Sequence, residues 1–112
     1  MAKPTSRPYS QYSLHALALF GQLIREARIE KAMTAAELSE RAGISRALLQ
    51  RIERGEPGCS IGAAFEVAAI CGLQLFGQEK QQQVDYLTLH KGKMALLPKS
   101  VRKTMQVVND DF

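Results

Sequence analysis

The sequence has little of what several classes of protein require. It contains two cysteines, no tryptophan, and no apolar run near the roughly 18 residues that a membrane-spanning helix needs. Its first residues, MAKPTSRPYS, lack the apolar stretch of a secretory signal peptide. We therefore expect a cytoplasmic protein that does not enter a membrane.

The two cysteines do not form a recognisable metal or redox motif. Cys59 and Cys71 lack CxxC spacing, and neither has a nearby histidine to complete a set of metal ligands. Thiols remain free in a reducing compartment. We interpret Cys71 as a small core residue and Cys59 as a loop thiol, and we predict no metal and no other cofactor.

Residues typical of a catalytic site are equally scarce. His15 and His90 are far apart in the sequence, and there is no nucleophile elbow and no phosphate-binding loop. The acidic residues are scattered as solvated surface charges are. The sequence predicts no catalytic residues and a protein that is not an enzyme.

What the chain has is a modest excess of positive charge. Fifteen Lys and Arg against eleven Asp and Glu give a net charge of +4, which favours an anionic partner. A chain of 112 residues can bury one modest core. We expect a flexible N-terminal arm over 1–12, a compact domain over 13–79, and a C-terminal extension and tail over 80–112.

Apolar residues recur at helical spacing through the compact domain, which predicts an all-α bundle. The first helix covers about 13–31, and the second has Thr34 as its cap, with Glu37 completing a capping box, and ends at Gly43. A third begins after Ser45 and ends at Gly55, and a fourth runs from Ser60 to Gly72. The expected core positions of the first and fourth helices are Leu14, Leu17, Phe20 or Gly21, Ile24, Ala27, Ile61, Ala64, Phe65, Ala68 and Cys71.

The periodicity changes after the fourth helix. In LQLFGQE, Leu73 and Leu75 alternate with polar neighbours, which predicts a short strand. A single strand has no partner within a helical domain, so we expect it to pair with the same strand of a second subunit, across a dimer. Helical character is expected over about 80–90, interrupted at KGK, and the final PKSVRKTMQVVNDDF is interpreted as a tail.

The third predicted helix has two different faces. Leu48, Leu49 and Ile52 project to one side. The other side has no acidic residue and presents Arg46, Ala47, Gln50, Arg51 and Arg54. In the major groove Arg recognises guanine, Gln can pair with adenine, and Ala accommodates a thymine methyl group.

The residues before this helix support the same interpretation. Gly43 allows a left-handed backbone turn, and Ser39 is small where two helices cross, as in a helix-turn-helix. The alternative is an ordinary solvated basic face, but the cap, the turn and the small residue together favour DNA binding. Arg41, Arg51 and Arg54 are candidates for phosphate as well as base contacts, and Thr34 and Ser45 complete the set of predicted DNA-binding residues. Lys3 and Arg7 suit either a minor-groove arm or an idle tail.

The stretch from Leu23 to Leu75, including IREARIEKAMTAAELSERAGISRALLQRIERG, resembles the Cro/repressor (XRE) type of helix-turn-helix domain found in lambdoid phage repressors. The resemblance implies a lambda-repressor-like bundle and a buried ion pair between Arg28 and Glu53. It also places Arg46, Ala47, Gln50 and Arg51 at base-reading positions. Ala35 departs from the family, which usually has Gln there, so Thr34 and the amides of the second helix must provide the phosphate anchor.

Within this family, the expected strand and the tail LPKSVRKTMQVVNDDF resemble HipB-like antitoxins. That resemblance implies a homodimer that represses its own toxin-antitoxin operon and binds a HipA-like kinase toxin. Two alternatives remain. One is a free-standing repressor that binds double-stranded operator DNA without a toxin partner, and the other is an adaptor that uses the third helix on an acidic protein.

Overall fold

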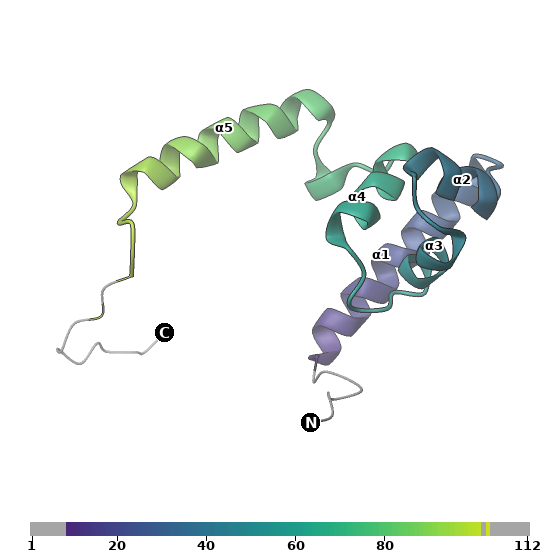
Figure 1. The fold of residues 1–112 in the computed structure, drawn as a ribbon. Helices are drawn as coiled ribbons and strands as arrows, with labels where there is room; N and C mark the ends of the chain where they lie inside the picture. Colours follow the sequence, from purple (N-terminus) through teal and green to yellow (C-terminus); the bar gives the residue numbers. More distant parts are fainter. Residues whose placement is uncertain (1–8, 102, 104–112) are drawn as a thin grey trace. The chain divides into compact units, whose positions relative to one another are not determined.

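The computed structural model describes residues 9–101 and residue 103. In chain order the elements are α1 (Gln11–Glu30), α2 (Ala35–Ala42), α3 (Arg46–Glu53), α4 (Ile61–Ile70), the short 3-10 helix η1 (Leu75–Gly77) and α5 (Lys80–Leu96) (Figure 1). The chain divides into two compact units between Gly77 and Gln78. We call the described part of the first unit the body. The expected all-α class is confirmed for the described residues.

A hydroxyl side chain caps the start of each of the first four helices. Ser10 accepts a hydrogen bond from the Ser13 amide at 3.1 Å, and α1 therefore begins at Gln11, two residues before the expected start. Ser45 caps α3 by accepting from the Leu48 amide at 3.0 Å. The predicted arm over 1–12 is thus helical at its last two residues, and its first eight residues, with Lys3 and Arg7, lie outside the described part of the chain.

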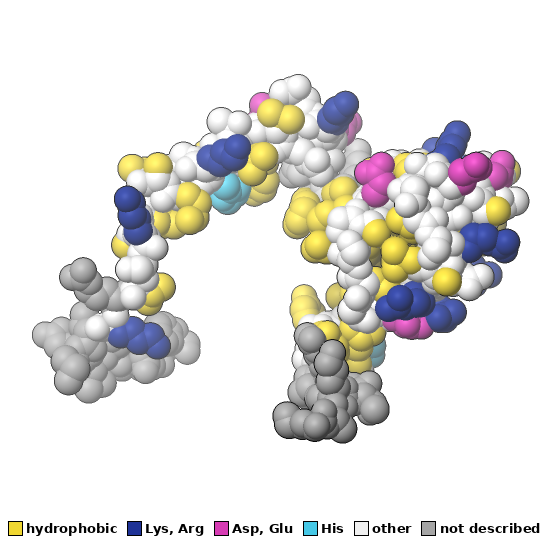
Figure 2. All heavy atoms as spheres, in the orientation of Figure 1, with side chains coloured by type: hydrophobic (Ala, Val, Ile, Leu, Met, Phe, Trp, Pro, Cys, Tyr) yellow, Lys and Arg dark blue, Asp and Glu magenta, His cyan; other side chains and the backbone are white. Residues whose placement is uncertain are grey.

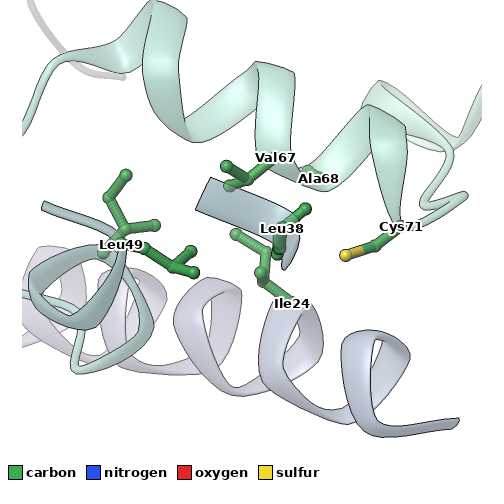
Figure 3. Close-up of a cluster of buried hydrophobic side chains, with 7 residues drawn as sticks. Ile24, Leu38, Leu49, Val67, Ala68 and Cys71 are labelled. Carbon is green, nitrogen blue, oxygen red and sulfur yellow. The ribbon is translucent and has the colours of Figure 1, made fainter. Parts of the chain in front are cut away.

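The core of the body lies where α1, α2, α3 and α4 meet. Its fully or almost fully buried apolar residues are Ile24, Leu38, Leu49, Ile52, Val67, Ala68 and Cys71 (Figure 3). Burying each of the large aliphatic side chains contributes about 1.5–3 kcal/mol. Burial also raises the pKa of the Cys71 thiol. Cys71 is therefore the small core residue that we predicted, and both cysteines are free.

One predicted core position in α4 is wrong. The Ile61 side chain is 70% exposed, whereas Val67, which we had not singled out, is completely buried. Ile61 is the first residue of α4, and contact with the core begins at Ala63. Helical spacing identified the apolar face but not where along the helix packing begins.

Two glycines allow α1 to approach the end of α3 at backbone distance. A Cβ atom added at Gly21 would lie 2.5 Å from the carbonyl oxygens of both Ile52 and Glu53. A Cβ atom at Gly55, whose φ is +74°, would lie 2.7 Å from the backbone of Ala18. Backbone atoms cannot move aside as a flexible side chain can, so Gly21 and Gly55 set the distance between these helices.

The strand predicted around Leu73 and Leu75 is wrong, and with it the strand pairing across a dimer. Both leucines pack against the core of the body, and residues Leu75–Gly77 form η1 instead. Phe76 and Gly77 have left-handed backbone angles, with φ of 58° and 66°. Two consecutive left-handed residues cannot continue an extended strand, so the alternating leucines reflect a turn closing over the core.

The helix α5 belongs to the second unit and continues through the KGK sequence to Leu96, which contradicts the expected interruption. Gly92 is tolerated inside it. No residue of α5 is buried, and the large hydrophobic side chains exposed along it are Val84, Tyr86, Leu87, Leu89, Met94 and Leu96. Most of the predicted tail lies outside the described residues. Among the helices that are described, none combines the length and apolarity needed to cross a bilayer.

Candidate nucleic-acid interface

The segment from α2 to α3 forms a tight helix-turn-helix. Gly43 ends α2 with φ of 70° and ψ of 31°, and its amide donates to the Glu40 carbonyl at 3.1 Å. The amide of Ile44 donates to the Ser39 carbonyl at 3.0 Å. Ser39 is 3% exposed, and its hydroxyl donates to the Ala36 carbonyl. Both the left-handed turn and the small buried residue were expected from the sequence.

The outer face of α3 brings together five of the residues predicted to bind DNA. Leu49 and Ile52 anchor the helix in the core. The opposite side is exposed and presents Arg46, Ala47, Gln50, Arg51 and Arg54, the last as the C-terminal cap. In Figure 2, Lys and Arg side chains gather around the part of the body where α3 lies. We call these five residues the α3 face.

The other three predicted DNA-contacting positions on the body are Thr34, the N-terminal cap of α2, Arg41 within α2, and Ser45, the N-terminal cap of α3. The hydroxyl of Thr34 accepts from the Glu37 amide at 3.0 Å, and the Glu37 carboxylate accepts from the Thr34 amide at 2.8 Å. Hydrogen bonding to the Thr34 amide lowers the pKa of Glu37. Arg41 is exposed, with Nη1 at 3.5 Å from the Met33 sulfur. Neither Thr34 nor Arg41 is part of the α3 face.

Arg28 and Glu53 form a two-point ion pair that ties α1 to α3. The Nε atom of Arg28 donates to Oε2 of Glu53 at 2.8 Å and Nη2 donates to Oε1 at 3.1 Å. The remaining Nη1 donates to the Met33 carbonyl at 3.0 Å. The side chains are only 12% and 10% exposed, and the hydrogen bond to Glu53 raises the pKa of Arg28. The pair holds the last residue of α3 in place.

Glu56 modifies the α3 face in a way that we did not predict. Its carboxylate accepts from Arg54 Nη2 at 2.6 Å and Nε at 2.9 Å, and from Arg51 Nε at 3.3 Å. The hydrogen bond from Arg54 is the main reason why the pKa of Glu56 is lowered. Two of the four polar side chains of the α3 face, Arg51 and Arg54, are therefore paired with a carboxylate in the free protein.

The contacts of Glu56 were not predicted because only carboxylates within the helix were considered. Glu56 follows α3, but the left-handed Gly55 turns the chain back, and the Glu56 amide donates to the Arg51 carbonyl at 3.0 Å. The signal was present as RGE directly after the helix. An acidic residue next to a turn glycine can return to the last turn of the preceding helix.

Arg25 was also missed. This exposed residue of α1 lines a pocket of about 250 Å³ together with Gln50 and Arg54 of the α3 face. Ala35 forms another part of the wall, at the position where the resemblance would place Gln. Arg25 lies three residues before Arg28, on a neighbouring part of the same helix surface. That spacing is the signal that could have connected it with α3.

The described residues offer no evident metal site, since no three of their His, Cys, Asp or Glu side chains lie close enough to hold an ion. The interface is instead a group of guanidinium and amide side chains on one short helix, with a further cation from α1. Such groups donate hydrogen bonds to phosphate oxygens and to the acceptors on base edges.

Comparison with known proteins gives the same assignment. Residues 19–79 match a family model described as a helix-turn-helix domain, which is more than half of the chain and includes all of α2 and α3. An immunity repressor protein of Bacillus phage phi105 is 30% identical over 92 residues, covering 77% of this chain and 64% of the relative. No solved structure matches the chain. The chain therefore belongs to the helix-turn-helix domain family and carries a DNA-binding domain of that type.

Proposed function

We propose that this protein is a sequence-specific transcriptional repressor that binds double-stranded operator DNA as a homodimer. The observation that carries the proposal is the state of Arg46 and Gln50. Both are exposed on the α3 face, and among the described residues neither side chain has a hydrogen-bond or ion-pair partner. Solvated donors at the start of an anchored helix are suited to reading base edges.

The two residues are one helical turn apart, so they can address neighbouring base pairs. In this proposal Arg46 binds guanine, Gln50 binds adenine, and Ala47 lies against a thymine methyl group. Arg41, Arg51, Arg54 and the start of α2 with Thr34 contact phosphates and set the position of the helix. Arg25 adds a cation beside Gln50.

One copy offers too little of this surface for a selective operator. The eight residues of α3 span about 12 Å. A homodimer would place two copies of α3 in successive major grooves, about 34 Å apart on a two-fold symmetric site. A promoter occupied in this way is closed to RNA polymerase. The likeness to a phage immunity repressor supports this mode of action.

The test is selection of preferred sites from random duplex DNA, followed by gel shifts with single variants. Arg46→Ala should lose about 1–3 kcal/mol of binding free energy and relax the preference at one base pair in each half-site. Lys80→Ala removes an exposed cation outside the body and is the matched control. If Arg46→Ala bound every sequence like the wild type, the assigned role of the α3 face would be wrong.

A narrower form of the proposal makes the chain a HipB-like antitoxin that also binds a HipA-like kinase toxin. The expected strand that suggested it is absent from the described residues, so its remaining basis is the sequence of the tail. The similarity to an immunity repressor favours a free-standing repressor. Co-expression with the neighbouring genes decides between them, because an antitoxin would co-purify with a kinase and the complex would shift promoter DNA.

The adaptor alternative uses the α3 face on an acidic protein. It predicts binding of that protein that is insensitive to added operator DNA. The repressor proposal predicts instead that binding of promoter DNA persists in the presence of an excess of an unrelated acidic protein.

A further inference from the structure

A groove of about 450 Å³ opens on the body between α1 and the segment 73–76. Ala16, Leu17 and Phe20 of α1 form one side, and Phe65 and Phe76 are part of the other. None of its nine lining residues is charged, and Gln74 is the single polar residue among them. In Figure 2, hydrophobic side chains are exposed on the side of the body where η1 lies.

Phe76 is the unusual residue of this groove. It has φ of 58° and ψ of 24°, and it is 80% exposed. A left-handed conformation costs a residue with a side chain about 1–2 kcal/mol. Within the body neither the strained backbone nor the exposed ring is offset by burial. A partner that covers the ring would offset both.

The apolar surface extends beyond the groove. The rings of Phe76, Phe65 and Phe20 form a row with edge-to-face contacts, at centroid separations of 6.1 Å and 6.2 Å. A second pocket of about 250 Å³ shares Leu17, Phe20 and Phe65 with the groove and continues to Ile61, and its far wall reaches Ile52 of α3 and Glu56. The 70% exposure of Ile61 thus belongs to the same surface as that of Phe76.

We propose that two copies of the chain meet through this groove, with Phe76 of each copy entering the groove of the other. The inference rests on the proposed function, because a repressor that reads a two-fold operator requires a second copy. Each copy carries a net charge of +4, so two copies repel each other wherever basic surfaces meet. The uncharged groove is a surface that can be self-complementary without burying a charge.

The location of the groove suits this role. Its lining comes from α1, α4 and residues 73–76, and none comes from α2 or α3. The α3 face therefore stays open when the groove is occupied. Since the groove and α3 belong to the same body, contact through it would fix the separation of the two α3 helices, as an operator with fixed half-site spacing requires.

Two substitutions in the full chain test the proposal, with sedimentation equilibrium as the measurement. Ala16→Lys places an ammonium group in the groove from an exposed helical position, and Gln22→Lys adds the same charge elsewhere on α1 as its control. We expect Ala16→Lys to raise the dimer Kd at least tenfold. Gln22→Lys should leave it within about twofold of the wild type.

Phe76→Gly separates assembly from folding. Glycine accepts the left-handed backbone, so at concentrations where the wild type is monomeric the variant should unfold at the same temperature or higher. It should nevertheless dimerise at least tenfold more weakly, because the ring is gone. If Phe76 were needed only to complete the fold of the body, Phe76→Gly would instead lower the unfolding temperature and leave the dimer Kd unchanged.

The remaining outcomes are equally decisive. A wild-type protein that binds operator DNA but stays monomeric would overturn the groove proposal and leave DNA recognition standing. If Leu87→Lys in α5 dissociates the dimer and both groove variants leave the dimer intact, the groove proposal is overturned and the two copies pair through α5. If the groove variants dissociate a dimer that binds no DNA, the contact surface stands and the proposed function fails.

Discussion

The helices α3 and α5 show how little length has to do with what holds a helix in place. The eight-residue α3 has two buried anchors, Leu49 and Ile52, an ion pair at its last residue and a glycine contact with α1. The seventeen-residue α5 buries nothing. Isolated helices of this size are marginal in water, so packing decides stability. Of these two helices, α3 is the one that tertiary contacts hold in place.

The largest effect should come from separating α3 from α1 at the ion pair. Arg28→Met leaves the Glu53 carboxylate without its partner in a site that is about one-tenth exposed, and should cost about 3–5 kcal/mol of the free energy of unfolding. Urea denaturation measures the loss. Arg25→Met, three residues earlier and exposed, is the control and should cost far less. Similar losses for both variants would mean that the pair does not hold α3.

Adding a single methyl group at Gly21 should also show how closely α1 and α3 are packed. Gly21→Ala puts a Cβ atom 2.5 Å from two backbone carbonyl oxygens, so α1 and α3 must move apart. We expect a cost of about 3 kcal/mol, at the upper end for overpacking, read from the same urea titrations. An unchanged denaturation midpoint would show that the contact between these helices is looser than the structure indicates.

Substitution of Glu56 tests the role of the α3 face in binding DNA. Glu56→Gln releases Arg51 and Arg54 from a carboxylate, so operator affinity should rise about tenfold and log Kd should depend more steeply on log salt, by about one for each added phosphate contact. Glu66→Gln removes the same charge from an exposed position of α4 and is the control. Equal gains in the two variants would point to net charge alone.

The lowered pKa of Glu56 also predicts how the affinity difference between the wild type and Glu56→Gln depends on pH. The arginines lower the pKa of Glu56, so its ion pairs persist at and above the ordinary carboxyl range and are lost only when the pH falls through the lowered pKa. The affinity gap between the wild type and Glu56→Gln should therefore be constant around neutral pH. Gel shifts at pH 6 and 8 measure it.

The smallest expected effect is on α5. Gly92→Ala meets no atom within 4 Å and removes a glycine from a helix interior, which should stabilise that helix by about 1 kcal/mol. Circular dichroism should show more helix, while the cooperative unfolding of the body stays unchanged. A change from glycine to alanine would thus stabilise α5 at Gly92 but destabilise the contact between α1 and α3 at Gly21. A loss of helix content would mean that the space beside Gly92 is used.

The sequence was most informative where structure depends on nearby residues. The Thr34 and Glu37 capping box, the Ser45 cap and the left-handed Gly43 turn involve groups no more than five residues apart, and all are present. The helical periodicity of the hydrophobic residues likewise distinguished the α3 face from the buried side with Leu49 and Ile52. The roles of these residues in binding DNA remain predictions.

Prediction failed where distant or returning segments meet. Leu73 and Leu75 alternate as strand residues do, but contact with a core made by α1 and α4 turns that segment into η1. Glu56 is invisible to a helical projection because Gly55 folds it back, and Gly21 looked like one more position on an apolar face.

Taken by itself, the order of residues determined four helices, the caps of three of them, a tight turn and a cationic face, because hydrogen bonds across three or four residues and helical periodicity are local. Tertiary structure alone decided how closely α1 approaches α3, which arginines Glu56 holds, and that Phe76 is strained beside an apolar groove. The approach of α1 to α3 and the groove depend on distances between segments far apart in the chain, and the contacts of Glu56 depend on the turn at Gly55, so helical periodicity predicts neither.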